Sequence, residues 1–398
     1  MVKEKEKVIK LLKFIKSRCK IRDPFGGDLL NMFMFQDKYI FFSKSCSGQL
    51  VMLIDILQKR AKRTRKLISR EKITDLVQLS ILNILHNNSD PLRETTKIFA
   101  EMSLTHKKFR VLIPIGNLRI AEQIDLGSIR LIPFVSKEEF FSMGYSEIDD
   151  EIKDFIYTQF SEQFGDDKRT WTLAEVTTFA VDADKARRNA FDLAELTLSF
   201  LRLFNNVNVI YLPHKKLMIV NLNTIVVAGN QILPSYSWHN QDINSYNIDS
   251  RMLARIQPHL TSFKTLLSKG KLTKFDEAIL LAIKWAGDAV IEQSNPMKLL
   301  KCIISLETIM QIESRTNKQE HFATGIIHLL YSRSTTRVKG RVMKFAKSIY
   351  KARSSTVHAG VVPYLLPTDI AQIDLWSRSI AQLALVKGVG KSKIDDIF

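Results

Sequence analysis

Apolar residues recur at helical spacing through most of the first hundred residues. Val51, Ile54 and Leu57 follow one another at three-residue steps. Such spacing is typical of an amphipathic helix that buries one face. We therefore expect mainly helices between residues 7 and 98, within an N-terminal helical region that spans residues 1–106.

A strongly basic segment interrupts this pattern. In KRAKRTRKLISREK, which begins at Lys59, eight lysines and arginines stand against a single acidic residue, Glu71. Such a segment either binds phosphates or forms the solvated face of a helix. Because no aromatic residue is interleaved with the cations, the sequence favours neither interpretation.

Strand-like runs begin near residue 107. FRVLIPIGNLRI and IDLGSIRLIPF are rich in β-branched residues, and Pro114, Gly116 and Gly127 interrupt them as turns would. WTLAEVTTFAV, VNVIYL and LMIVNLNTIVVAG are further strand candidates, and DADKARRNAFDLAELTLSFLRLF has a helical pattern. Residues 107–240 are therefore expected to form an α+β domain. A sensing or recruiting role is assigned to it by elimination alone.

Residues 234–250, PSYSWHNQDINSYNIDS, are polar and are the best candidate for a linker. The pattern after them is helical almost to the end. We therefore expect a third, all-helical domain over residues 241–398. The predicted fold class is α+β and mostly helical, with the strands confined to the front and middle of the chain.

The charge of the chain indicates a class of partner. Of its 398 residues, 59 are Lys or Arg and 41 are Asp or Glu, which gives a formal charge of +18. This surplus attracts RNA, DNA or an anionic membrane surface. No apolar run approaches the roughly 18 residues of a membrane-spanning helix, and the start has no secretion signal. We expect a cytoplasmic protein without a membrane partner.

Cysteine and histidine are too dispersed to predict a metal centre. Cys19, Cys46 and Cys302 lie far apart, and none has a histidine at metal-ligand spacing. We expect buried free thiols, no metal site and no cofactor.

One arginine and one histidine near the C-terminus form the candidate reactive pair. In RVMKFAKSIYKARSSTVHAG, an apolar stripe ends at Ile349, and Arg353 falls four residues further along the same face. Gly360 is a natural helix cap, which would place His358 at the helix end. Five residues separate Arg353 from His358 by about 140° around a helix. Either the helix breaks before His358, or two copies of the chain combine across a two-fold axis.

The setting of this pair favours a phosphate substrate. No Asp or Glu occurs between His321 and Thr368. A 2′-hydroxyl could attack the adjacent phosphate while His358 moves a proton and Arg353 stabilises the phosphoryl charge, without a metal ion. Arg341, Lys347 and Lys351 are the candidate RNA-binding residues.

The segment IYKARSSTVHAG resembles the Arg-x4-6-His signature of HEPN ribonucleases, most closely that of the Apea-like branch. The matching residues are Tyr350, Arg353, Ser354, Val357, His358 and Gly360. Upstream, FDEAILLAIKWAGDAV with Trp285 and LLKCIISLETIM with Glu307 agree in order and spacing. The resemblance covers roughly the last third of the chain, from Leu272.

The resemblance implies a helical bundle, a homodimer formed through it, and metal-independent endoribonuclease activity, frequently in toxin systems and antiviral defence. It makes Arg353 and His358 the catalytic pair. Ser354 and Tyr350 take supporting roles beside them, as does Glu307.

Glu307 can also be interpreted without the family, because it lies on an otherwise apolar helix where a carboxylate needs a partner. It either orients Arg353 or forms a structural ion pair with Arg333 or Arg341. The structural pairing is favoured, since buried pairs are often architectural.

The sequence thus favours an RNA endonuclease that acts as a defence or toxin effector, in which residues 1–240 bind a protein or nucleic-acid trigger. The alternative is an inactive HEPN dimer that serves as an RNA-binding or assembly module. A DNA-binding regulator is a third interpretation, but no helix-turn-helix signature supports it. KGVGKS near the C-terminus lacks the first glycine of a phosphate-binding loop and is set aside.

Overall fold

The structure is a computed structural model. It describes residues 2–18, 20–21, 32–35, 38–41, 44–63, 68–102, 107–115, 118–133, 154, 157–158, 172–204, 225–228, 231–233, 246–311, 317–359 and 365–392. Most of these residues are helical, and the strands among them form three sheets, which confirms the α+β class.

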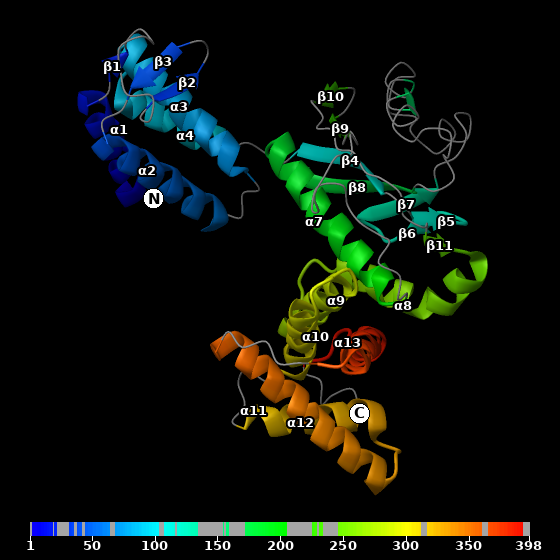
Figure 1. Cartoon of the computed structure of the whole chain (residues 1–398). Coiled ribbons are helices and arrows are strands. Elements are labelled where there is room, and N and C mark those ends of the chain that lie inside the picture. The colour runs from blue at the N-terminus through cyan, green and yellow to red at the C-terminus, as the bar shows by residue number, and fades with distance from the viewer. Residues whose placement is uncertain are drawn as a thin grey trace. The chain divides into compact units, whose positions relative to one another are not determined.

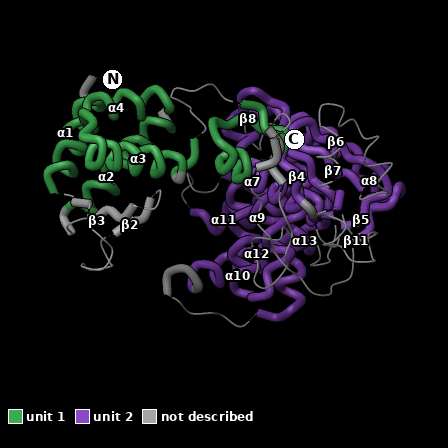
Figure 2. Tube along the Cα trace, turned by 90° about the horizontal axis from the view of Figure 1, so that it is seen from above, with its two compact units in different colours: residues 1–110, 177–189, 226–233 green, residues 111–176, 190–225, 234–398 purple. Residues whose placement is uncertain are grey.

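The chain divides into two compact units, coloured separately in Figure 2. Unit 1 contains residues 1–110, 177–189 and 226–233, and unit 2 contains residues 111–176, 190–225 and 234–398. The three domains proposed from the sequence stay a prediction, and each unit is described by itself.

Unit 1 is built mainly on four amphipathic helices. They are α1 (Val2–Arg18), α2 (Lys44–Arg63), α3 (Arg70–His86) and α4 (Pro91–Glu101). Their inward faces share one apolar core, in which Leu12, Leu53 and Val77 are fully or almost fully buried. The helical expectation for residues 7–98 is therefore confirmed over these four helices, but it is wrong over residues 20–21, 32–35 and 38–41, which form strands.

A small sheet in this region was not predicted. Its strands are β1 (Lys20–Ile21), β2 (Met32–Phe35) and β3 (Lys38–Phe41), in the order β1-β3-β2. MFMF has no polar residue with which to alternate, so its sequence carries no two-residue period.

Two cations of the basic segment form ion pairs within unit 1. Arg60 lies 3.0 Å from Glu4, Nη1 to Oε2, and its guanidinium stacks 4.4 Å from the centre of the Phe99 ring. Arg70 bonds Asp55 at 2.8 Å. Residues 64–67 lie outside the described ranges. Arg60 therefore has a structural role, whereas the Arg70–Asp55 pair is about half exposed and contributes little to stability.

The larger sheet has six strands in the order β10-β9-β4-β8-β7-β6. They are β4 (Lys107–Ile115), β6 (Ile124–Asp125), β7 (Ile129–Pro133), β8 (Thr172–Ala180), β9 (Ile225–Ala228) and β10 (Gln231–Leu233). The helix α7 (Ala183–Arg202) lies between β8 and β9 in the chain. Strands β7 and β8 are antiparallel, with Arg130 opposite Glu175 and ion-paired to it at 2.7 Å. The strands expected near residues 109, 124 and 172 are confirmed, whereas VNVIYL lies outside the described residues.

The end of the expected linker is ordered. Strand β11 (Tyr246–Ile248) pairs in parallel with β5 (Leu118–Ile120), and Asp249 then caps the next helix by accepting from the Met252 N–H at 2.8 Å. The linker prediction is therefore wrong over residues 246–250, because polar residues there serve as strand end and helix cap.

Helices make up the rest of unit 2, as expected. They are α8 (Ser250–Ser268), α9 (Lys274–Val290), α10 (Asn295–Met310), α11 (Lys318–Tyr331), α12 (Thr336–Ala359) and α13 (Pro367–Gly388). Helix α10 contacts α9, α11, α12 and α13, and none of its residues from Leu299 onward is exposed. Polar side chains on α10 must therefore find partners on neighbouring helices.

The C-terminal segment KGVGKS closes against the start of α9. The fully buried carboxylate of Asp276 accepts from Lys269 Nζ at 2.7 Å and from the N–H groups of Thr273 and Gly390, each at 3.0 Å. Burial raises the pKa of this carboxyl, but the hydrogen bonds outweigh that effect and lower it to about 2. The N–H of Gly390 is thus occupied by a carboxylate of the same unit, where a phosphate loop would offer it to a ligand.

A glycine sets the distance between α7 and α9. A Cβ at Gly287 would lie 2.4 Å from the Cα and carbonyl oxygen of Ser199, which are backbone atoms that cannot rotate away. Gly287→Ala should therefore lower the free energy of unfolding by about 2–3 kcal/mol. Urea unfolding followed by circular dichroism measures this change.

Gly340→Ala is the matched control. Gly340 also lies within a helix, α12, and a Cβ there would meet nothing within 4 Å. The same substitution should stabilise the protein there by up to about 1 kcal/mol, because alanine is the better helix former. Equal effects at the two positions would contradict a close approach at Gly287.

Candidate active site on helix α12

Helix α12 runs unbroken from Thr336 to Ala359, so the position of His358 lies in its last turn. Figure 1 shows α12 as one continuous coil. A helix break before His358, one of the two alternatives drawn from the sequence, is therefore wrong. The side chain of His358 lies outside the described part of the structure, as does Gly360.

The inner face of α12 is the apolar stripe expected from the sequence. Val342, Ala346 and Ile349 are buried. Phe345 packs edge-on against Trp376 of α13, with the ring centres 5.4 Å apart. Arg353 follows on the same face, with 21% of its side chain exposed.

Glu307 of α10 is the partner of this arginine. Its Oε2 lies 3.2 Å from Arg353 Nη2, and its Oε1 accepts a hydrogen bond from the Tyr350 hydroxyl at 2.7 Å. Each carboxylate oxygen therefore has its own donor on α12. The interpretation favoured from the sequence, a pair with Arg333 or Arg341, is wrong: both arginines are exposed.

Tyr350 holds the carboxylate from a buried position. Its ring packs 5.1 Å from that of Phe322 on α11, and the Arg353 guanidinium lies 6.0 Å from its centre. Burial, followed by the hydrogen bond to Glu307, raises the pKa of the Tyr350 hydroxyl. The hydroxyl therefore stays a donor and fixes the orientation of Glu307.

The arrangement leaves Arg353 with unused donors. A guanidinium has five N–H groups, and Glu307 engages Nη2 alone. The Nε atom is buried and meets no acceptor among the described residues. Because Nε is buried, a contact from Arg353 to an anion such as a phosphate would have to come from the Nη groups at the end of the guanidinium.

The other predicted site residues differ in their surroundings. Ser354 is half-buried, and Lys351 and Arg341 are exposed. Lys347 forms an ion pair with Glu320 of α11, so its charge is already neutralised within the unit. This pair could not be expected from the sequence, because Glu320 lies just before the acid-free stretch and on a different helix.

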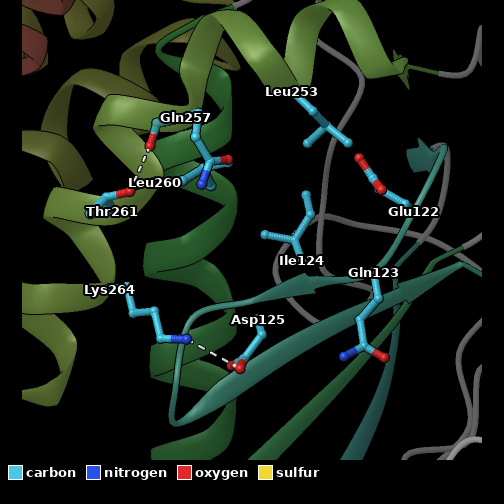
Figure 3. A pocket seen from close by; sticks show the side chains of 9 residues that line it. All are labelled: Glu122, Gln123, Ile124, Asp125, Leu253, Gln257, Leu260, Thr261 and Lys264. Atoms are coloured by element: carbon cyan, nitrogen blue, oxygen red, sulfur yellow. Dashed lines mark hydrogen bonds and ion pairs between the residues drawn. The ribbon is translucent and has the colours of Figure 1, made fainter.

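A shallow groove elsewhere in unit 2 was not predicted. It has a volume of about 240 Å³ and lies between α8 and residues 122–125. Figure 3 shows it bridged by the Lys264–Asp125 ion pair of 3.2 Å. None of its nine lining residues is His or Cys, and its lysine is ion-paired with Asp125. It is also smaller than most ligand pockets, about 300–1,000 Å³. The groove is therefore not a candidate active site.

Within the described ranges, no three His, Cys, Asp or Glu side chains are grouped as metal ligands would be. None of the described helices combines the length and hydropathy that a bilayer crossing needs. Comparison of the chain with protein-family models, with curated proteins and with solved structures finds no match.

Proposed function

We propose that the chain is a metal-independent endoribonuclease of the HEPN type, in which Arg353 and His358 are the catalytic pair. The observation that carries the proposal is the Glu307–Arg353 contact on a helix that continues through His358. It holds a guanidinium in a defined orientation beside an acid-free, basic segment. The resemblance of IYKARSSTVHAG to the HEPN signature supports the same function, and it also motivates the proposed role as a defence or toxin effector.

Each residue has a distinct part in the proposed reaction. The substrate 2′-hydroxyl attacks the adjacent phosphorus, and His358 moves a proton as general base or acid. Arg353 stabilises charge on the non-bridging phosphoryl oxygens. Glu307 and Tyr350 position Arg353 and do not touch the substrate. Residues 1–240 sense or recruit the trigger.

The proposed working unit is a homodimer. Arg353 faces α10, whereas the position of His358 lies about 140° away around the same continuous helix. One chain therefore presents the two residues in different directions. A two-fold axis that brings two copies of α12 together would combine Arg353 of one chain with His358 of the other.

The alternative function is an RNA-binding or assembly module that has lost cleavage. The neutralisation of Arg353 by Glu307 favours it, since an arginine with a purely structural role would have the same partner. The two functions differ in one measurable respect, because the module binds RNA without cutting it.

The decisive experiment incubates the purified protein with total RNA in excess EDTA and analyses the new ends. We expect cleavage in chelator, with a 2′,3′-cyclic phosphate on one product and a 5′-hydroxyl on the other, because the neighbouring hydroxyl needs no metal-bound water. An RNA with 2′-deoxyribose at the cleavage site should resist. Products with a 3′-hydroxyl and a 5′-phosphate would instead identify a metal-dependent nuclease, and intact RNA would favour the binding module.

A further inference from the structure

From Arg341 to Lys351, the exposed residues of α12 all lie on one side of the helix, and Arg337 shares that side. Arg337, Arg341, Lys344, Ser348 and Lys351 are all exposed and follow one another at steps of four, three, four and three residues. At about 100° per residue they fall within a wedge of about 80°. Four of the five carry a positive charge. We call these four cations, Arg337, Arg341, Lys344 and Lys351, the outer row.

No carboxylate neutralises the outer row within the described part of the chain. Helix α12 contains no Asp or Glu, and its recorded ion pairs, Lys347 with Glu320 and Arg353 with Glu307, lie off this face. Like charges at three- and four-residue spacing repel each other on a helix. A bound polyanion would remove this repulsion and release counterions.

The outer row leads toward the position of His358. The same alternation of four and three residues continues from Lys351 to Ser355 and then to His358. By helical position, residue 358 lies within about 20° of Lys351. Arg353, in contrast, is on the inner face and bound to Glu307. A strand that follows the outer row therefore reaches His358 from its own chain.

We propose that the outer row is a track for the phosphate backbone of a single RNA strand, which it delivers to His358. A single row of cations on one helix matches one backbone, whereas the two backbones of a duplex call for two separate rows. The contacts involve phosphates, so the track positions RNA without reading its sequence. The choice of RNA rests on the proposed ribonuclease function.

The test measures binding separately from cleavage. The probe is a fluorescein-labelled 2′-O-methyl RNA of about 16 nucleotides, which lacks the attacking hydroxyl. Its affinity is measured by anisotropy at several salt concentrations for the wild-type protein and for the combined variant Arg337→Gln, Arg341→Gln, Lys344→Gln and Lys351→Gln. The control removes four exposed cations from α8 and α9 with Arg251→Gln, Arg255→Gln, Lys274→Gln and Lys284→Gln. Both variants lose the same net charge.

We expect the outer-row variant to bind at least about tenfold more weakly near physiological salt. The slope of log affinity against log salt is negative, and its magnitude should decrease by about three because four phosphate contacts are lost. The control should stay within about twofold of wild type, since long-range attraction is screened beyond about 8 Å. Equal losses in the two variants, or no loss in either, would overturn the track. Where circular dichroism shows that the combined variant is misfolded, the pairs Arg337→Gln/Arg341→Gln and Lys344→Gln/Lys351→Gln should each remove about half of the slope.

Cleavage of unmodified RNA separates this proposal from the ribonuclease function. Track-dependent binding without cleavage by the wild type would leave the track standing and refute the nuclease. Wild-type cleavage rates and wild-type binding in the outer-row variant would refute the track and leave the nuclease standing.

Discussion

His358→Ala should lower the rate of RNA cleavage by about 10²–10⁴-fold without loss of stability, because it removes the proposed proton-transfer group. The position lies in the last turn of α12, where a smaller side chain does not interrupt the backbone hydrogen bonds of the helix. Single-turnover cleavage measures the first effect and thermal unfolding the second. Cleavage at the wild-type rate would remove His358 from the mechanism.

Arg353 requires a compensated variant. Arg353→Ala alone leaves Glu307, with 11% of its side chain exposed, without its cation, which is expected to cost about 3–5 kcal/mol. The pair Arg353→Ala/Glu307→Gln removes both charges and should recover most of that stability. Its cleavage rate should still be about 10²–10³-fold below wild type, because the contact to the phosphoryl oxygens is missing.

Combining the two inactive proteins tests the composite site. When His358→Ala chains and Arg353→Ala/Glu307→Gln chains are coexpressed, a mixed dimer contains one intact pair made of residues from both chains. If the pair forms across a two-fold axis, purified mixed dimers should have about half of the wild-type activity, because one of their two sites is intact. Mixed dimers that form but stay inactive would place both residues in one chain, and a fully active monomer in light scattering would do the same.

Asp276→Ala is the second substitution with a large expected effect. It removes a buried carboxylate with three donors, and it leaves Lys269 and the start of α9 without their partner. The free energy of unfolding should fall by about 3–5 kcal/mol. Asp125→Ala is the control, because the Asp125–Lys264 pair is about half exposed, with 51% and 46% of the side chains accessible. It should cost about 1 kcal/mol or less. Urea unfolding at neutral pH measures both.

The contribution of Asp276 should also depend on pH in a defined direction. Its pKa is lowered in the folded state to about 2, from a usual value of 3.8. The stabilisation is therefore fully present above the unfolded pKa and is lost as the pH falls from about 4 toward 2. The difference in stability between wild type and Asp276→Ala should shrink across this window. A constant difference would show that Asp276 acts through packing alone.

Local patterns in the sequence predicted two kinds of element. The strands β4, β7 and β8 were predicted from apolar runs rich in β-branched residues, and the helix α7 and the apolar stripe of α12 from apolar residues at helical spacing. The sheet over residues 20–41 and the strand β11 were predicted from neither pattern. They form by pairing with other strands, which local sequence does not encode.

The candidate site could be predicted only along α12 itself. The burial of Arg353 and the need of Glu307 for a partner followed from helical spacing. Their pairing did not, because 46 residues separate them and the contact depends on how α10 crosses α12. The Lys347–Glu320 pair could not be predicted for the same reason, because it also joins two helices. Lys347 was therefore proposed as an RNA-binding residue without knowledge of its intramolecular partner.

Cys46 and Cys302, two of the three cysteines of the chain, offer a way to follow local opening of the structure. Cys46 lies in unit 1 and Cys302 on α10 of unit 2, and both are free thiols fully shielded from solvent. A shielded thiol reacts with a labelling reagent only when its surroundings open, so its labelling rate reports how often the local structure unfolds. The labelling rate of Cys302 would measure local opening around α10, the helix that carries Glu307. The labelling rate of Cys46 would independently measure opening of the core of unit 1.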